Sequence, residues 1–462
     1  MRTRVPLGGK LCVTLLAMLA CDTASPRPTP DPIGSGSGSN EIEPAPWTDA
    51  WVNREGKRFA EDPAYRRAAL ETSLVNHANT YSQQRLGSYG LRERGWDVLP
   101  VWNPRSLPVT AELAAALERG ELPPVTAERA PLWDGKTPTT MTEWAALGKR
   151  VFFEYPMRAE VFMEWGLMKP ELVAALGVER TADGGVPGLV VFANVDGKTR
   201  VGITCAICHT AVREGALVVG AARRRFDYGR LRLSYFEDTR SSVEPELARR
   251  MATWGPGRAD VTEDNDEDPV AIPDLWGLRD ETVLTQAGTI KHASPLALAI
   301  RQDTQLTHAN HQRIRPPREL AWALAMYLYS LEPPAPKVRG SFAQLVRGAS
   351  LFATACRSCH DNAAYAGKAI PAKKVGTDPS LATGQARGTG HYRIAPLLDV
   401  ANAAPYLHHG PVTSLDELLS PARLAPDYRG GRLGPGAIPG HAFGTELAAP
   451  DRAALIAFLE IL

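Results

Sequence analysis

The sequence predicts a mainly α-helical chain with two similar units in tandem, a helical region before them and an insertion in the first unit. Three observations support this fold class. The stretch Cys205-Ala206-Ile207-Cys208-His209 has a counterpart in Cys356-Arg357-Ser358-Cys359-His360. Each is preceded by a glycine and an apolar-Phe pair, in Leu147-Gly148-Lys149-Arg150-Val151-Phe152 and Arg347-Gly348-Ala349-Ser350-Leu351-Phe352. Each unit also closes with an apolar pattern of helical period.

The repeated stretch pairs two cysteines, separated by two residues, with a histidine directly after them. This spacing is typical of c-type haem attachment, in which each thiol forms a thioether and the histidine ligates the iron. A redox dithiol would not need the histidine, and a zinc ribbon would place its two pairs about 15–20 residues apart. We therefore predict two cytochrome c-type haem domains with two covalently bound haem c groups. Their attachment and proximal residues are Cys205, Cys208, His209, Cys356, Cys359 and His360.

The N-terminus has the features of an export signal. Basic residues precede a short apolar run that ends at Cys21, and such a run is too short to span a bilayer as a stable helix. We predict a lipoprotein-type signal peptide over 1–21, with Cys21 as the lipid-carrying terminus and plain secretion as the alternative. Residues 22–46 are rich in Pro, Ser and Gly and predict a flexible linker. We expect an exported protein of the periplasm or cell envelope, anchored to a membrane by lipid.

The composition limits the classes of partner that the protein can bind. The formal net charge is +1, whereas nucleic-acid-binding proteins usually carry a basic excess, so we expect no nucleic acid. Once the signal is removed, the cysteines that remain beyond Cys21 belong to the two motifs. A core and its cofactors, rather than disulfides, must therefore stabilise the exported chain.

The chain after the linker divides into three parts. Residues 47–131 predict a helical N-terminal region without a chemical motif. Residues 132–336 form the first haem domain and residues 337–462 the second. Cys356 follows Phe352 by four residues and Cys205 follows Phe152 by 53, which predicts an insertion of about 49 residues in the first copy. A run of apolar residues towards its end, Leu189-Val190-Val191-Phe192, predicts a short strand.

The two closing helices have the same apolar spacing. Their apolar positions are Leu320, Leu324, Leu328 and Leu331 in the first domain, and Leu455, Phe458, Leu459 and Leu462 in the second. In cytochrome c folds the last helix crosses the first and covers the haem.

Two charged runs lie in the first domain. Arginines that could hold haem propionates, through the match of a guanidinium fork to a carboxylate, are Arg223, Arg224, Arg225, Arg230 and Arg232; a solvated basic loop is the alternative. Asp264, Asp266 and Asp268 alternate as calcium ligands do, but Pro269 stands where a calcium loop needs glycine. A solvated acidic loop is therefore the preferred interpretation.

Function depends on the sixth ligand of each iron. Met326 is the last methionine of the chain, so the second domain cannot supply the common His/Met pair. Its candidates are His391, His408, His409 and His441. For the first iron the candidates are Met251, His292, His308 and His311, and an open distal site stays an alternative. Candidate electron bridges between the haems are Trp254, Trp276 and Trp322, for which core packing is the simpler role.

Several stretches resemble the bacterial diheme cytochrome c peroxidase superfamily, which includes the tryptophan-tryptophylquinone-forming diheme enzyme and the diheme rubber oxygenases. The resemblance covers most of the chain after about residue 147 and is most specific over 392–397, 404–410 and 414–419. The methionine ligand of the peroxidases is missing here, near Ala422 and Arg423. Residues 440–445 and 201–204 look closer to the rubber-oxygenase branch, in which a C-terminal histidine ligates the second iron, and this implies His441.

The resemblance implies that the first haem reacts with peroxide or oxygen and the second relays electrons. We expect a diheme oxidoreductase with a small redox protein or a quinone-linked donor or acceptor as its partner. Polyisoprene cleavage is not expected, because the chain is shorter than the rubber oxygenases. The alternative is a pure electron carrier in which both irons are six-coordinate.

Overall fold

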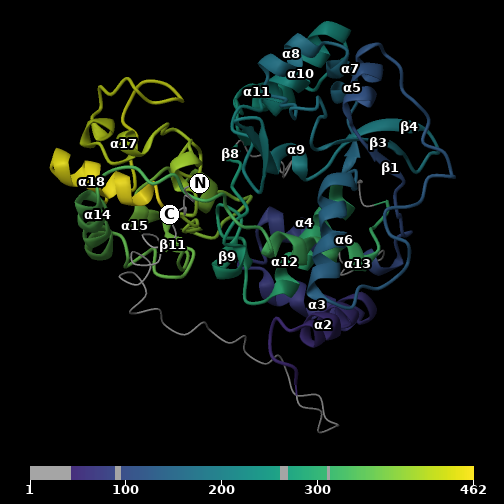
Figure 1. Cartoon of the computed structure of the whole chain (residues 1–462), viewed down its shortest axis with the longest axis horizontal. Coiled ribbons are helices and arrows are strands. Elements are labelled where there is room, and N and C mark those ends of the chain that lie inside the picture. The colour runs from purple at the N-terminus through teal and green to yellow at the C-terminus, as the bar shows by residue number, and fades with distance from the viewer. Residues whose placement is uncertain (1–42, 89–94, 261–268, 310–312) are drawn as a thin grey trace, which may run out of the picture.

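The computed structural model describes residues 43–88, 95–260, 269–309 and 313–462, and helices form most of its regular structure. Figure 1 shows a larger lobe and a smaller lobe, the latter in light green and yellow with α14 and α18. The mainly α prediction is confirmed. The predictions for the signal peptide, for Cys21 and for Asp264 to Asp268 concern residues outside those that the structure describes.

The N-terminal region begins with helices, as predicted. α2 (Asp49–Glu61) and α3 (Pro63–Ser73) meet at Asp62, whose side chain accepts a hydrogen bond from the Tyr65 amide and caps α3. Pro63 follows at the first helical position, where a missing N–H costs nothing. The region then departs from the prediction, because β1 joins a sheet. Its remaining elements are α4 (Thr80–Ser88), η1 (Trp96–Val98), β1 (Ser106–Pro108) and α5 (Ala111–Glu118).

The first helix pair lies in the larger lobe. α6 (Met141–Glu154) crosses α13 (Arg318–Tyr329), and Gly148 lies where the backbones meet. A Cβ at Gly148 would lie 1.9 Å from the Ala323 carbonyl oxygen, so only glycine allows this approach. The rings of Phe152 and Tyr327 pack edge to face beside the crossing, with centroids 5.5 Å apart.

The smaller lobe repeats this arrangement with α14 (Phe342–Ala355) and α18 (Ala449–Leu459). A Cβ at Gly348 would lie 2.1 Å from the Ala454 carbonyl oxygen, and the Phe352 and Phe458 ring centroids are 5.4 Å apart. Both α6 and α14 also begin with a capping box. In each, the hydroxyl of the N-cap residue accepts from the backbone amide three residues later, and the side chain of that later residue accepts from the N-cap amide. The predicted duplication of crossing helices is therefore present in the structure.

The segment between α6 and the first Cys-x-x-Cys-His motif carries the sheet. Its strands run in the order β1-β3-β4-β2, all paired antiparallel. The predicted strand is confirmed as β3 (Leu189–Ala193), the most buried of the four. The other elements here are β2 (Arg158–Ala159), α7 (Val161–Leu167), α8 (Pro170–Ala175) and β4 (Thr199–Ile203).

Short elements fill the rest of both lobes. In the larger lobe they are α9 (Ala206–His209), β5 (Thr210–Arg213), β6 (Ala216–Val219), α10 (Tyr228–Thr239), α11 (Pro245–Ala252), β7 (Arg258–Ala259), β8 (Val270–Ala271), η2 (Leu278–Asp280), β9 (Val283–Leu284), β10 (Ile290–Lys291) and α12 (Pro295–Ala309). In the smaller lobe they are β11 (Ile370–Pro371), α15 (Ala372–Val375), α16 (Ser380–Thr383), β12 (His391–Tyr392), η3 (Val400–Asn402), α17 (Leu415–Leu418) and η4 (Pro421–Leu424).

A second duplicated segment, which the sequence did not predict, runs through η2 and η3. Each of these 3₁₀ helices follows a residue in the left-handed region, and each is followed by a turn closed by a glycine amide. In one turn Gly288 N–H donates to the Thr285 carbonyl; in the other Gly410 N–H donates to the Leu407 carbonyl, both at 3.1 Å. The repeat therefore covers 277–290 and 399–412 at matching positions.

This repeat joins the lobes reciprocally. The Ala271 amide of the larger lobe donates to the His408 carbonyl at 2.9 Å, and the Arg393 amide of the smaller lobe donates to the Gln286 carbonyl at 2.9 Å. Ala271 and Arg393 occupy equivalent positions in the two copies, as do Gln286 and His408. Each copy thus donates a backbone hydrogen bond to the turn of the other copy, so the contacts across the junction are reciprocal, as in a two-fold symmetric interface.

The surface view shows the two lobes with a notch between them, and an apolar area lies in the part of the view where Figure 1 labels α9. Within the described residues, no helix is long and apolar enough to cross a membrane.

Candidate haem-attachment sites

The first Cys-x-x-Cys-His motif forms a single helical turn. Cys205 precedes α9, and the Thr210 hydroxyl donates to the Ala206 carbonyl at 2.7 Å to close the turn. Gly188, with φ +92°, lets the start of β3 approach the backbone of α9 closely, since a Cβ at Gly188 would lie 2.1 Å from the Ile207 nitrogen. Local backbone packing therefore fixes the direction of the motif.

His209 is held at one ring nitrogen. Its Nδ1 hydrogen-bonds the Pro273 carbonyl oxygen at 3.0 Å, and burial lowers the pKa of His209 to about 4. With this lowered pKa the imidazole is neutral at pH 7, and because Nδ1 donates to the carbonyl, Nε2 is the nitrogen left to bind a metal, as in ligating histidines. His209 thus has the orientation and charge of a proximal ligand.

Cys205 and Cys208 are half-buried and form no disulfide in the structure. Burial raises the pKa of Cys205 to about 12 and that of Cys208 to about 11. A redox dithiol shows the opposite, because its attacking thiol has a lowered pKa. These cysteines therefore fit stable thioether attachment better than thiol exchange.

The second motif repeats the arrangement at the end of α14. Cys356 is the residue that ends this helix, and His360 Nδ1 hydrogen-bonds the Tyr365 carbonyl oxygen at 2.6 Å. The pKa of His360 is lowered by burial, and burial raises the pKa of Cys356 to about 11. Both motifs thus hold a neutral histidine by a backbone carbonyl, which is what two similar iron sites require.

His441 lies close to His360. Burial and the neighbouring His360 imidazole lower the pKa of His441 to about 4. The backbone of His441 is fixed on both sides: its amide donates to the Val375 carbonyl and its carbonyl accepts from Arg423 Nη2, each at 2.8 Å. Its buried Nδ1 meets no hydrogen-bond partner among the described residues. A buried Nδ1 without such a partner leaves this imidazole unengaged at that nitrogen, so His441 stays a candidate ligand.

The other histidines of the smaller lobe have different surroundings. His391 Nδ1 bonds the Thr389 carbonyl oxygen at 2.8 Å. The His408 ring stacks on Tyr392 with centroids 4.2 Å apart, and the His409 ring lies 4.3 Å from that of His408. His408 also takes part, through its carbonyl, in the junction of the lobes. The influence of the His360 imidazole on the pKa of His441 therefore keeps His441 the favoured candidate of the four.

The candidate ligands for the first iron also differ in their surroundings. Both ring nitrogens of His292 are engaged, Nδ1 with the Glu281 carbonyl at 2.9 Å and Nε2 with the Tyr329 hydroxyl. Met251 is buried in a cluster with Leu231 and Trp254. His308 lies on α12, and His311 lies outside the described residues.

The arginines after α9 have protein partners. The Arg223 guanidinium is fully buried and donates to the Thr210 and Pro187 carbonyl oxygens. Arg224 bonds the Ile272 carbonyl and Asp274, and Arg230 pairs with Glu237 on α10 at 2.8 Å. Arg232 lies over the rings of the α10 region, and Arg225 is exposed. These partners account for the basic run better than either the propionate or the loop interpretation.

The three candidate tryptophans lie in three different places. Trp322 is part of the large core with Phe59, and Trp254 stacks on Tyr228 with centroids 5.8 Å apart. Trp276 is buried at the junction, where it packs near Leu331 and Leu398. Gly277, the next residue, touches the smaller lobe, since a Cβ there would lie 2.7 Å from the Ala364 Cβ. Trp276 is thus the tryptophan that lies between the two lobes.

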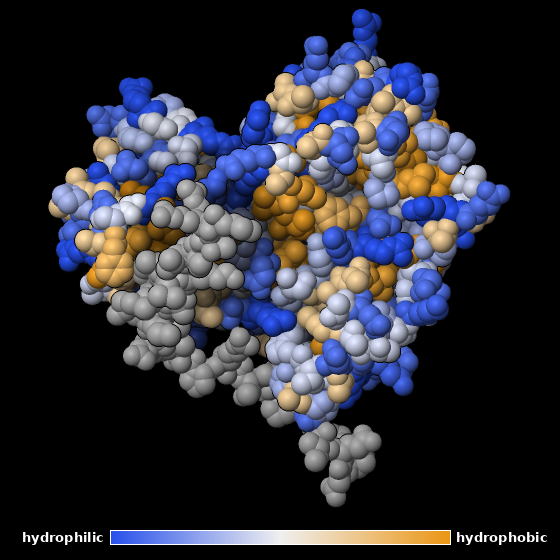
Figure 2. All heavy atoms as spheres, in the orientation of Figure 1, coloured by the Kyte–Doolittle hydropathy of each residue, from blue (hydrophilic) through white to orange (hydrophobic). Residues whose placement is uncertain are grey.

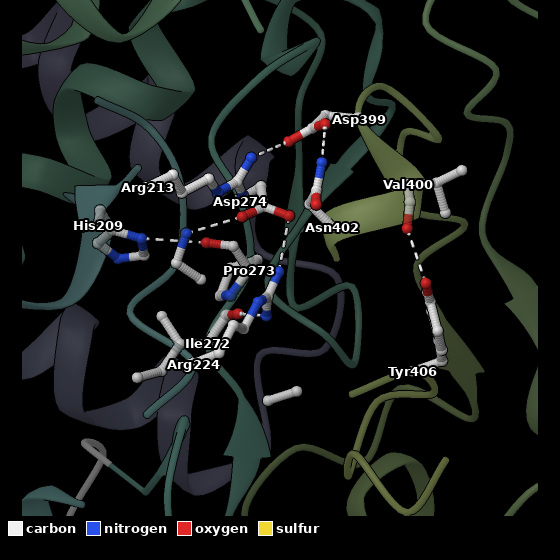
Figure 3. A network of polar contacts seen from close by, with 12 residues as sticks. His209, Arg213, Arg224, Ile272, Pro273, Asp274, Asp399, Val400, Asn402 and Tyr406 are labelled. Carbon is white, nitrogen blue, oxygen red and sulfur yellow. Dashed lines mark hydrogen bonds and ion pairs between the residues drawn. The ribbon is translucent and has the colours of Figure 1, made fainter. Parts of the chain in front are cut away.

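Figure 3 shows polar contacts that lead from His209 towards the smaller lobe. Beside Pro273, which holds His209, Asp274 pairs with Arg224 at 2.6 Å and accepts from the Ala222 amide. From the same part of the larger lobe, Arg213 pairs with Asp399, the residue before η3. The backbone that holds His209 is therefore next to the junction.

Among the described residues, no group of three or more His, Cys, Asp or Glu side chains could hold a bare metal ion. No protein-family model matches the chain, and no curated protein matches it either.

Proposed function

We propose that the protein is an exported diheme c-type cytochrome with oxidoreductase activity, peroxidase-like or oxygen-activating at the first haem, with electron transfer through the second. Each bound haem would supply an iron that exchanges electrons. Where a coordination position of the iron is open, it would also bind peroxide or oxygen. Cys205, Cys208 and His209 would hold the first haem; Cys356, Cys359, His360 and His441 would hold the second. The resemblance to diheme peroxidases and rubber oxygenases belongs to this proposal.

The observation that carries the proposal is the inequality of the two sites. At the second, the His360 imidazole lowers the pKa of His441 in addition to burial, and the buried His441 Nδ1 meets no partner at hydrogen-bond geometry among the described residues. At the first site, both ring nitrogens of His292 are engaged in hydrogen bonds to Glu281 and Tyr329, so neither is left to bind the iron. A site with two histidine ligands suits electron transfer, while a site without a strong distal ligand can bind a small oxidant.

One feature supports covalent haem at both motifs. The carbonyl contacts of His209 and His360 leave Nε2 as the metal-binding nitrogen. We further propose export and lipid attachment at Cys21, and a small redox protein or a quinone-linked donor or acceptor as partner.

The first experiment measures haem content and ligand binding on the full chain. We expect two haem c per chain, and rapid binding of cyanide or carbon monoxide at one of them. Two low-spin haems that ignore both ligands after reduction would contradict the enzymatic function.

The second experiment tests His441. We expect His441→Ala to convert the second haem from low-spin to high-spin, because its distal ligand is lost, as seen in absorption and electron paramagnetic resonance spectra. His77→Ala is the matched control, since His77 is exposed and its ring bonds the Glu71 carbonyl oxygen. An unchanged spectrum in His441→Ala would transfer the role to His408, His409 or His391.

One observation favours the alternative, a pure electron carrier. His308 lies seven residues after Arg301 on α12, so the two share a face of the helix, and the Arg301 charge acts on the pKa of His209, for which burial is the larger influence. If His308 ligates the first iron, His308→Ala will create a high-spin haem from an all-low-spin protein.

A further inference from the structure

Arg423 of η4 is a fully buried arginine whose guanidinium bonds only the backbone. Its Nε donates to the Leu418 carbonyl at 2.8 Å, its Nη1 to the Ile438 carbonyl at 2.6 Å and its Nη2 to the His441 carbonyl at 2.8 Å. A buried guanidinium is costly unless its N–H groups are satisfied, and each of its three nitrogens has an acceptor here. The fork of Arg423 is therefore occupied by three backbone carbonyls.

These carbonyls belong to two separate segments. Leu418 is the last residue of α17, whereas Ile438 and His441 lie on a segment after η4, which we call the 438–441 segment. The Ile438 amide in turn donates to the Arg423 carbonyl at 2.7 Å. Arg423 thus bonds both ends of the 438–441 segment and connects it to the end of α17.

The backbone of His441 is held in an uncommon conformation. Its φ is +45°, in the left-handed region that residues other than glycine rarely adopt. Such a conformation persists only where the surrounding contacts hold it. Two contacts do so here, because the His441 amide donates to the Val375 carbonyl and its carbonyl accepts from Arg423, each at 2.8 Å. The direction of the His441 side chain therefore depends on these two bonds.

Apolar packing connects the 438–441 segment to the second Cys-x-x-Cys-His motif. Ile438 belongs to the buried cluster of α14 and α18, against which Cys356 packs. Val375, the hydrogen-bond partner of the segment, packs against another cluster together with Cys359. Each end of the segment is thus connected to a different cysteine of the motif, through a different cluster.

The His441 ring lacks the restraint that the two motif histidines have. His209 and His360 each bond a backbone carbonyl through Nδ1, as metal-ligating histidines usually do. The buried Nδ1 of His441 meets no hydrogen-bond partner among the described residues. Its ring packs edge to face with Phe443, with centroids 5.4 Å apart. The orientation of this imidazole therefore has to come from its backbone.

We propose that Arg423 is the positioning residue of the second haem site, where it holds the His441 imidazole in place for the iron by fixing the backbone of His441. This inference rests on the proposed function, which assigns His441 as a ligand. The planar guanidinium offers its N–H groups in a fixed fork, whereas the lysine ammonium is a point charge on a flexible stem. Lysine at this position would keep the charge but could not hold the three carbonyls in the same geometry.

The test compares Arg423→Lys and Arg423→Gln with Arg223→Lys in the full chain. Arg223 is the matched control, because its guanidinium is also fully buried and also bonds backbone carbonyls, but in the larger lobe. Haem per chain is measured first. The low-spin signal of the second haem is then measured by electron paramagnetic resonance, with and without added imidazole.

We expect both Arg423 variants to keep two haems per chain and to lose part of the low-spin signal of the second haem. Added imidazole should restore this signal, because it can enter the coordination position that His441 has left. We expect Arg223→Lys to keep the second-haem signal of the wild type. A role of Arg423 in stability alone would not produce a loss that imidazole reverses.

A wild-type low-spin signal in both Arg423 variants would overturn the proposal, as would a lost signal that imidazole does not restore. Loss of the second haem from both variants would also overturn it, because Arg423 would then support the lobe as a whole and not one ligand. His441→Ala separates this inference from the proposed function. If His441→Ala makes the second haem high-spin and the Arg423 variants do not, only the inference fails. If His441→Ala leaves the spectrum unchanged, the assignment of His441 fails and the inference fails with it.

Discussion

Replacing Gly148 by alanine tests whether the two helix crossings are as close as the structure shows. The new Cβ would lie 1.9 Å from the Ala323 carbonyl oxygen and 2.6 Å from the Tyr327 Cβ. Ordinary contact requires about 3.5 Å, so α6 and α13 must move apart by roughly 1.5 Å. Overpacking of this kind costs about 3 kcal/mol, and alanine recovers about 1 kcal/mol of helix propensity. The net loss in the free energy of unfolding is therefore about 2 kcal/mol.

That loss corresponds to a fall of about 4–8 °C in the Tm of a lobe of this size. The assay is thermal unfolding of the full chain followed by circular dichroism. Gly348→Ala, with its Cβ 2.1 Å from the Ala454 carbonyl oxygen, should have a similar effect on the smaller lobe. Lys149→Ala is the control, because Lys149 is exposed on the same helix. If both glycine variants were as stable as this control, the duplicated close crossings would be refuted.

Two further predictions concern buried groups. Trp276→Phe should slow electron equilibration between the haems after rapid reduction without shifting the potential of either haem, because Trp276 lies at the junction. Trp254→Phe should leave the rate of equilibration unchanged, because Trp254 belongs to a separate cluster. Equal rates in both variants would exclude Trp276 as the bridge. Burial raises the pKa of Asp303 to about 7. The folded state then binds this proton more tightly than the unfolded state, so this group lowers the free energy of unfolding as pH rises from about 4 to about 7, by at most about 4 kcal/mol. Asp303→Asn should flatten the pH dependence of the Tm over that range, and an unchanged slope would show that Asp303 does not titrate there.

The sequence predicted what local patterns specify. The two motifs, the helix pairs and β3 each depend on residues close in the chain, such as a glycine four positions before a phenylalanine. The repeat of η2 and η3 was missed because equivalent positions, such as Gly277 and Asp399, share a backbone conformation but not a residue type. Such a repeat could be found from its one shared turn glycine, at Gly288 and Gly410, but a single glycine is a weak signal.

The arginines show the same limit. Arg223, Arg224 and Arg225 stand out because they are consecutive, yet the Arg223 fork is occupied by the carbonyls of Pro187 and Thr210. No local pattern reveals where those carbonyls point.

In the proposed function, electrons cross the junction of the lobes. Glu281 and Arg393 form an ion pair across it, with side chains 1% and 6% exposed. Removing either partner of such a pair leaves an uncompensated buried charge and costs about 3–5 kcal/mol. The Arg213–Asp399 pair and the reciprocal backbone bonds of Ala271 and Arg393 add to this restraint. Because Trp276 is packed inside the same junction, these contacts fix its distance to both motifs, and a bridge of fixed length is what steady electron transfer between two haems requires.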